Sequence, residues 1–168
     1  MAERLAGKEV ALAVKEWTKE AIEKLRQQGK IAKLAIVRVG QRPDDLYYEQ
    51  GLTKTCQNVG LAYQVVELPG DAGQQEIETA VSQVAADETI HGILLFSPLP
   101  KSIDENAVRR LIPAEKDVDC LTLAGAALVF AGRKEGFPPC TPAAVMEILR
   151  YYQVPLAGRK AVVLGRSM

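Results

Sequence analysis

The sequence predicts an α/β fold built on a parallel sheet with helices on both faces. Segments with helical spacing alternate with short segments that are apolar on both faces, as buried parallel strands are. The expected strands are residues 34–39, 63–68 and 93–96. Right-handed crossovers should connect them as neighbouring strands of one sheet.

Helices are expected before, between and after these strands, wherever apolar side chains recur at helical spacing. They cover approximately residues 10–28, 44–60, 77–85, 103–112 and 141–152. Gly29 suits the C-terminal end of the first helix, and Thr141-Pro142 suits the start of the last, because proline is favoured in a first helical turn.

The chain is expected to hold one complete domain, residues 1–153, and the start of another, residues 154–168. Pro155 and Gly158 mark the boundary between them. An apolar segment, 162–164, reads as a strand that runs into residues 165–167, Gly-Arg-Ser. A strand that feeds such a turn is a common start for a phosphate-binding βα junction.

Composition narrows the class of partner. Lys and Arg together number 21, and Asp and Glu together also number 21, so the formal net charge is zero. This charge does not indicate a nucleic-acid or membrane-surface partner. No apolar run approaches the roughly 20 residues of a membrane helix. The cysteines (Cys56, Cys120 and Cys140) form no Cys-x-x-Cys pair and are interpreted as free thiols in a reducing cytoplasm. With a single histidine, His91, no metal site is expected.

Three segments should gather beyond the carboxyl ends of the strands, where parallel α/β folds bind ligands. They are residues 40–48, 97–101 and 116–120. Each alone also has an ordinary structural interpretation: surface aromatics at Tyr47-Tyr48, a strand stop at 98–100, and a solvated charged turn at 116–119.

Taken together, these segments resemble the methylenetetrahydrofolate dehydrogenase/cyclohydrolase family over nearly the whole chain. The matching residues, in family order, are Gly40, Tyr48, Cys56, Gly60-Leu61, residues 91–100 (HGILLFSPLP), Lys116-Asp117-Val118-Asp119, Pro139-Cys140-Thr141-Pro142 and Gly165-Arg166-Ser167. The resemblance implies a folate-binding α/β domain followed by a Rossmann domain for NAD or NADP, whose first strand would be 162–164. Family members oxidise methylenetetrahydrofolate, and many then hydrolyse the methenyl product.

The resemblance also implies roles for individual residues. Tyr48 would stack on the folate ring system, and Asp119 would accept hydrogen bonds from the pterin amino and ring N–H groups; these two are the catalytic candidates. The remaining substrate-binding candidates are Leu52, Leu95, Phe96 and Ser97. The cofactor-binding candidates are Cys140 and Thr141, at a helix N-terminus, and Gly165, Arg166 and Ser167, on the adenosine-side phosphate.

Four positions depart from the family pattern. Leu52 stands where members with both activities carry a lysine, and Phe96 where a glutamine is usual. Cys120 replaces a glycine, and Asp45 a common serine. Lys54 does not restore the missing amine, because it lies about 200° around the helix from Leu52.

These losses should affect the two activities unequally. Hydrolysis of the methenyl cation needs protons to be moved, which leucine and phenylalanine cannot do. Hydride transfer to nicotinamide needs mainly positioning. The sequence therefore predicts a cytoplasmic NAD- or NADP-dependent dehydrogenase without cyclohydrolase activity, and the 168-residue chain alone is expected to be inactive. The alternative is an inactive family member that binds a small ligand or acts as a scaffold; sequence beyond Met168 would discriminate. The expected partner is a folate-type molecule, with a homodimer left open.

Overall fold

The computed structural model describes residues 3–165. Its sheet contains β1 (Lys33–Val39), β2 (Ala62–Leu68) and β3 (Gly92–Leu95) in the order β2-β1-β3, all parallel. The middle strand, β1, pairs with β2 along its whole length and with β3 over four residues. The three predicted strands are confirmed, each within one residue of its expected ends.

Both faces of β1 are covered, which explains its continuous apolar run. Ala35 and Val37 point to one face, where they join a core with Ile77 and Val81. Ile36 points to the other face and joins a smaller core whose members also include Phe96. Because each face buries apolar side chains, the strand shows no alternation of polar and apolar residues.

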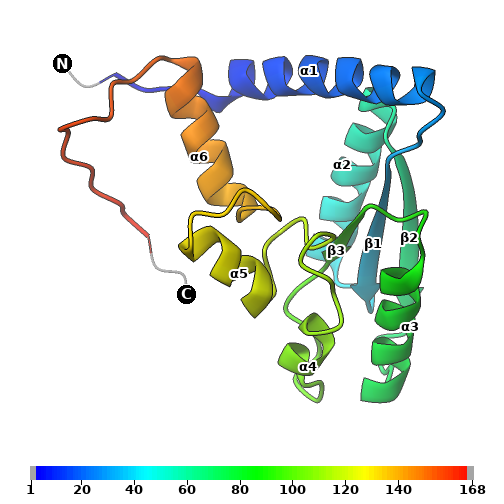
Figure 1. Ribbon diagram of the computed structural model, residues 1–168. Coiled ribbons are helices and arrows are strands. Elements are labelled where there is room, and N and C mark those ends of the chain that lie inside the picture. The colour runs from blue at the N-terminus through cyan, green and yellow to red at the C-terminus, as the bar shows by residue number, and fades with distance from the viewer. Residues whose placement is uncertain (1–2, 166–168) are drawn as a thin grey trace.

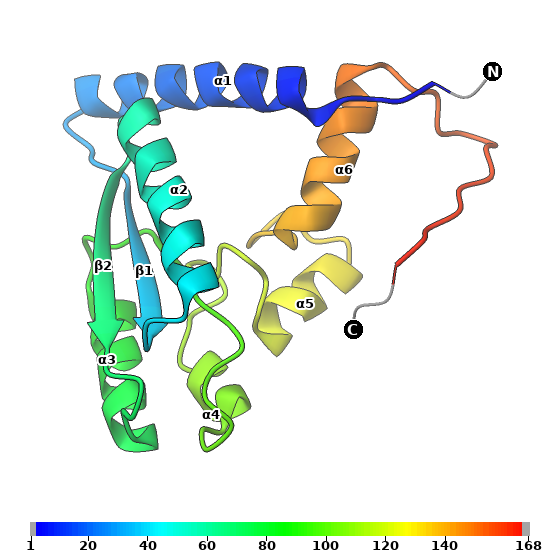
Figure 2. The same ribbon diagram turned by 180° about the vertical axis from the view of Figure 1, so that it is seen from behind.

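Six helices are described within residues 3–165. They are α1 (Gly7–Gln27), α2 (Pro43–Val59), α3 (Gln74–Ala86), α4 (Glu105–Arg109), α5 (Leu123–Phe130) and α6 (Cys140–Tyr151). The helix α2 covers one face of the sheet, and α3 and α4 lie on the other (Figures 1 and 2). The long helix α1 extends from α2 to α6, and the Tyr152 hydroxyl donates to the Ala6 carbonyl at 3.0 Å.

Two predicted helix features differ from the structure. The helix expected at 103–112 is limited to α4, because the Asp104 carboxylate accepts from the Ala107 N–H at 3.0 Å and so fixes the start of the helix. The helix α5 was not predicted. Its sequence, LAGAALVF, has no polar face, so it shows none of the periodicity that identifies an amphipathic helix.

The strand expected at 162–164 is not formed. Val162, Val163 and Leu164 lie in an exposed segment without regular structure, after α6. A strand is held by hydrogen bonds to a neighbouring strand, and none lies beside this segment in the described part of the chain. None of the helices described is both long and apolar enough to cross a membrane.

Candidate functional site

The predicted segments 40–48 and 97–101 directly follow the carboxyl ends of β1 and β3. The segment 116–120 was expected there too, but it begins beside the start of β3, where Asp117 forms a parallel bridge with Ile93 and the Ile93 N–H donates to the Lys116 carbonyl at 2.6 Å. Gly40 directly follows β1 and has a φ of 77°, a left-handed conformation that favours glycine. A Cβ on Gly40 would lie 3.3 Å from the Cα of Gly70, so the turn into α2 also has little room for a side chain. This close approach directs the chain into α2, which carries the tyrosines.

Tyr48, Leu52 and Phe96 form the apolar part of the site. The rings of Tyr48 and Phe96 are tilted by 49°, with their centroids 5.3 Å apart. Phe96 is buried, and Leu52 packs against the same small core. Tyr48 is 58% exposed and shares with Tyr47, Gly51, Leu52 and Thr55 a surface hollow of about 300 Å³. Leu52 and Phe96, which stand where the family pattern has a lysine and a glutamine, are therefore packed in one apolar core beside an exposed aromatic ring.

The loop 116–120 contains two residues with structural roles. The Lys116 Nζ donates to the carbonyls of Ala85 and Asp87, at 2.8 and 2.9 Å, and so ties the loop to the end of α3. Asp117 is buried, and its carboxylate accepts from the N–H groups of Leu121 and Thr122 at 2.9 and 2.8 Å. Both charged side chains are thus engaged by the backbone, which leaves Asp119 as the loop's ligand candidate.

Asp119 lies against the start of α6. Its Oδ1 accepts from the Cys140 backbone N–H at 3.4 Å, and the Cys140 thiol donates to the Val118 carbonyl at 3.4 Å. Partial burial of the thiol, followed by the hydrogen bond and charge of Asp119, raises the pKa of Cys140 to about 11. Burial raises the pKa of Tyr48 too, and the charges of Asp119 and Cys140 add to the shift. The structure thus brings Tyr48, Asp119 and Cys140 within electrostatic range of one another.

Ser97 belongs to a polar group at the edge of the site. Its hydroxyl accepts from Arg109 Nη2 at 3.5 Å, and Arg109 pairs with Glu105. Burial would raise the pKa of Glu105, but hydrogen bonds from the Leu99 N–H and from Ser97, together with Arg109, outweigh it and lower that pKa. Ser97 is itself exposed, so its placement agrees with a residue near a ligand.

Leu95 requires a correction as a substrate-binding candidate. Its side chain is buried in the core on the α3 face, together with Ile77 and Val81, whereas Phe96 belongs to the core on the α2 face. Successive residues of a strand point to opposite faces, so the two neighbours cannot both face the site. The side chain of Leu95 is a core side chain.

Cys120 adopts the backbone conformation that its glycine counterpart would favour. Its φ is 55°, in the left-handed region. A Cβ on Gly125 would lie 3.3 Å from the Cys120 sulfur, so the thiol packs against the first turn of α5. This left-handed position is therefore occupied by a residue with a side chain, directly after Asp119.

The cofactor-binding candidates are not assembled into one site. Thr141 is exposed in the first turn of α6, beside Cys140. Gly165 lies in the exposed segment after α6, with no neighbour near its Cβ position. Arg166 and Ser167 lie outside the described residues. Within residues 3–165, no three histidine, cysteine or acidic side chains are grouped as metal ligands would be.

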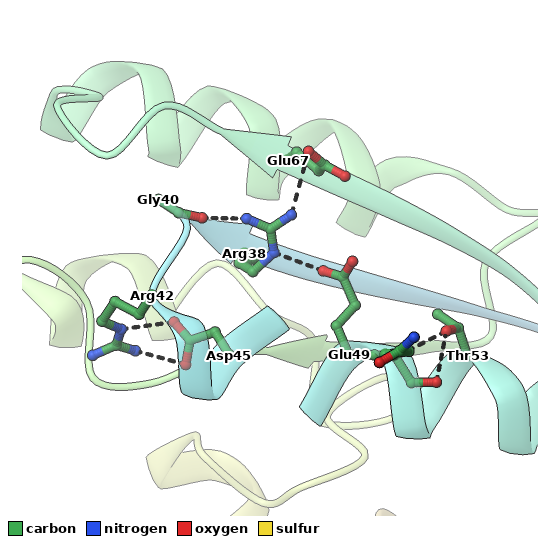
Figure 3. A network of polar contacts seen from close by, with 8 residues as sticks. Arg38, Gly40, Arg42, Asp45, Glu49, Thr53 and Glu67 are labelled. Carbon is green, nitrogen blue, oxygen red and sulfur yellow. Dashed lines mark hydrogen bonds and ion pairs between the residues drawn. The ribbon is translucent and has the colours of Figure 1, made fainter. Parts of the chain in front are cut away.

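Sequence reasoning missed an ionic cluster around a buried arginine next to the site, the Arg38 cluster (Arg38, Glu49 and Glu67), shown in Figure 3. Arg38 is 2% exposed and lies in β1, one residue before its end. A signal was present in the sequence, because Arg38 is a charged residue inside an otherwise apolar strand. A buried charge in such a position needs partners.

The chain matches known proteins over most of its length. A family model described as the catalytic domain of tetrahydrofolate dehydrogenase/cyclohydrolase matches residues 5–119. The bifunctional protein FolD of Carboxydothermus hydrogenoformans is 58% identical over 168 residues, which are 100% of this chain and 58% of that protein. FolD of Alkaliphilus oremlandii is 47% identical, again over 100% of this chain and 59% of the relative. The chain thus spans less than two thirds of these relatives.

Solved structures agree with this assignment. The bifunctional FolD methylenetetrahydrofolate dehydrogenase/cyclohydrolase from Campylobacter jejuni superposes with a TM-score of 0.93 at 32% identity, over 97% of this chain and 58% of that one. The dehydrogenase-cyclohydrolase of Trypanosoma brucei, solved with NADP and an inhibitor, has a TM-score of 0.89 at 33% identity, over 99% and 57%. Fold and sequence agree, and the chain belongs to the tetrahydrofolate dehydrogenase/cyclohydrolase family.

Proposed function

We propose that this chain is the folate-binding part of an NAD- or NADP-dependent methylenetetrahydrofolate dehydrogenase whose cyclohydrolase activity is lost. One observation carries the proposal: Leu52 packs with Phe96 in one apolar core beside the Tyr48 ring, where the family usually places a lysine and a glutamine. The exposed face of Tyr48 remains available for stacking, and Asp119 remains available as a hydrogen-bond acceptor for a pterin.

The two reactions make different demands on these residues. Hydrolysis of a methenyl cation requires a group that takes a proton from water and later returns it, and neither Leu52 nor Phe96 can hold a proton. Hydride loss from the methylene carbon leaves a cation that the folate nitrogens stabilise themselves. The protein then has mainly to orient the ring, which Tyr48 does by stacking and Asp119 by hydrogen bonding.

The start of α6 fits the nicotinamide end of the cofactor. Cys140 and Thr141 are exposed there, next to Asp119, so a bound nicotinamide would lie beside the folate site. When bound, the cofactor supplies the hydride acceptor. The raised pKa keeps the Cys140 thiol neutral at physiological pH, so the negative charge at this edge of the site is that of the neighbouring Asp119 carboxylate.

The cyclohydrolase prediction is tested with this chain joined to a nucleotide-binding domain of the family. We expect NADH or NADPH formation from methylenetetrahydrofolate, but no hydrolysis of methenyltetrahydrofolate above the uncatalysed rate. Leu52→Lys with Phe96→Gln should restore hydrolysis. Leu52→Lys alone should restore less, because its ammonium would face an apolar ring without a polar partner. Hydrolysis by the unaltered protein would reveal another base and overturn the proposal.

Folate binding is tested on the 168-residue chain itself. A half-open site leaves the ligand wet, so we expect weak binding of a tetrahydrofolate analogue in calorimetric titration and no oxidation of methylenetetrahydrofolate. Asp119→Ala should abolish the binding, since the pterin amino group would lose its acceptor. Glu115→Ala, at an exposed carboxylate of the same loop region, is the matched control and should leave it unchanged.

The outcome also decides between the two candidate functions. Equal affinity in the Asp119→Ala and unaltered chains would show that the pterin contact has not survived. That result would favour the second candidate function, an inactive family member that acts as a scaffold. The departures from the family pattern at Leu52, Phe96 and Cys120 are the reason to consider it.

A further inference from the structure

The Arg38 cluster joins three separate elements through one buried guanidinium. Arg38 Nε lies 2.6 Å from Glu49 Oε2 on α2, and Nη2 lies 3.3 Å from Glu67 Oε2 on β2. The third contact runs from Nη1 to the carbonyl of Gly40, in the turn that leads into α2. Figure 3 shows the guanidinium between the two carboxylates, with its contacts directed to different elements. Such a planar fork can hold several acceptors in a fixed geometry.

The first half of α2 has few apolar anchors. The buried residues of this helix are Cys56 and Val59, both in its second half. Tyr47 and Tyr48 are exposed, and Leu52 is half-buried. Apolar burial therefore fixes the end of α2 far from the site, and the ion pair between Arg38 and Glu49 ties the near half to the sheet.

The position of this ion pair bears directly on Tyr48. Glu49 is the next residue along α2, so fixing Glu49 to β1 fixes the rotation and height of the turn that carries Tyr48. Phe96, the partner of the Tyr48 ring, follows β3, and its N–H donates to the Val37 carbonyl of β1 at 2.9 Å. Both rings are thus held in position relative to the central strand β1. Tyr48 is held through the contact of Glu49 with Arg38, and Phe96 through its backbone hydrogen bond.

We infer that Arg38 is a positioning residue, which acts through Glu49 to hold the Tyr48 ring against Phe96 at the ligand site. In this role the Arg38 guanidinium does not itself contact the substrate. The consequence for ligand affinity rests on the proposed folate function, whereas the consequence for the geometry of the unliganded site does not.

The first measurement uses no ligand. Leu52 packs in the same small core as Phe96, so its methyl carbons and protons report on the placement of the neighbouring rings through ring-current shifts. In the ¹³C-methyl NMR spectrum of the 168-residue chain, Arg38→Met should displace the Leu52 signals while those of the α3-side core residues Ile77 and Val81 stay in place. Glu49→Gln, which keeps the side-chain size, should displace the Leu52 signals in the same direction by less.

The second measurement is affinity for the tetrahydrofolate analogue by calorimetric titration. Aromatic stacking contributes enough that losing its alignment in Arg38→Met should weaken binding by about three- to tenfold. If Arg38→Met does not fold, Glu49→Gln decides the question. It leaves the guanidinium its contacts with Glu67 and Gly40.

Two matched controls separate positioning from general loosening. Glu67→Gln weakens the same guanidinium's bond to β2 but leaves the link to α2 intact. Arg42→Met breaks an ion pair with Asp45 that lies within the first turn of α2 and does not reach the sheet. Both controls should leave the Leu52 signals and the affinity unchanged.

Three results would overturn the inference. They are unmoved Leu52 signals in both Arg38→Met and Glu49→Gln, equal displacement by the two controls, and unchanged affinity in a variant whose Leu52 signals have moved. A different result would show that the proposed function is wrong while the positioning role of Arg38 holds. In that result the unaltered chain does not bind folate, but its Leu52 signals still respond to Arg38→Met and not to the controls.

Discussion

Cys120 departs from the family pattern at a position where the backbone is left-handed. Its φ of 55° places a side-chain-bearing residue in the left-handed region, where contact between Cβ and the following carbonyl costs about 1–2 kcal/mol. The adjoining contacts, in which Asp117 accepts from Leu121 and Thr122, hold the backbone there regardless. Strain at this residue is thus offset by hydrogen bonds at its neighbours.

Cys120→Gly should accordingly stabilise the chain. Glycine removes the steric cost but adds about 0.5–1 kcal/mol of backbone entropy to the unfolded state, so the expected net gain in free energy of unfolding is about 0.5 kcal/mol. Urea denaturation followed by circular dichroism measures it. Cys120→Ala is the control, because alanine keeps the Cβ and its strain and should bring no gain. A loss of stability in the glycine variant would mean that packing of the thiol on Gly125 outweighs the strain.

At the scale of elements, the strands were predictable from sequence and the helices less uniformly so. A run such as β1 is apolar because both its faces are covered, and this property is local enough to be visible in the sequence. The helix α5 shows no such pattern, since its residues are apolar all round. The segment 162–164 is apolar as a strand is, but pairing requires a neighbour, and sequence periodicity does not report one.

The contact between the loop 116–120 and α6 can be tested through the Cys140 thiol. Partial burial, with Asp119 adding to it, raises the thiol pKa to about 11, so the fold favours the neutral form. The stabilisation is therefore fully present below the ordinary thiol pKa, about 8.5, and is lost as pH rises towards 11. The rate of iodoacetamide alkylation at Cys140, followed by peptide mass mapping, should rise with pH to an inflection near 11.

Asp119→Asn should move that inflection to lower pH, because it removes the negative charge that opposes the thiolate. Cys56, alkylated in the same samples, serves as the internal reference, because burial raises its pKa and Asp119 does not contribute. An inflection at the ordinary thiol pKa in the unaltered chain would show that the Cys140 thiol is neither partly buried nor in contact with Asp119 in solution.

For the whole molecule, the residues of the candidate site differ in how far the sequence alone could predict their roles. Tyr48 and Asp119 could be predicted from motifs with fixed spacing, and the structure places them within electrostatic range. The burial of Leu95 on the opposite face follows from strand register, which a motif match does not consider. Arg38 could not be assigned a role from sequence, because its partners Glu49 and Glu67 lie 11 and 29 positions away and meet it through the fold.

The side of the molecule formed by α5 and α6 leaves large apolar side chains in water. Phe130 is 97% exposed and Leu123 is 84% exposed. They are seven positions apart, so they lie on the same face of α5 with two turns between them. On α6, Val145 and Met146 are about half exposed. Figures 1 and 2 show these two helices standing apart from the sheet, with the start of α1 beside α6. Exposed apolar surface of this kind favours association.

We therefore expect the 168-residue chain to self-associate as its concentration rises. Sedimentation velocity should show the change, and Leu123→Ser with Phe130→Ser should shift the equilibrium toward the monomer. These substitutions should cost little stability, because the replaced side chains are already in water. Ile31→Ser is the matched control: Ile31 is 66% exposed but lies in the connection between α1 and β1, so its replacement should leave association unchanged. A single monomeric species at every concentration would show that the α5 face is tolerated in water without a partner.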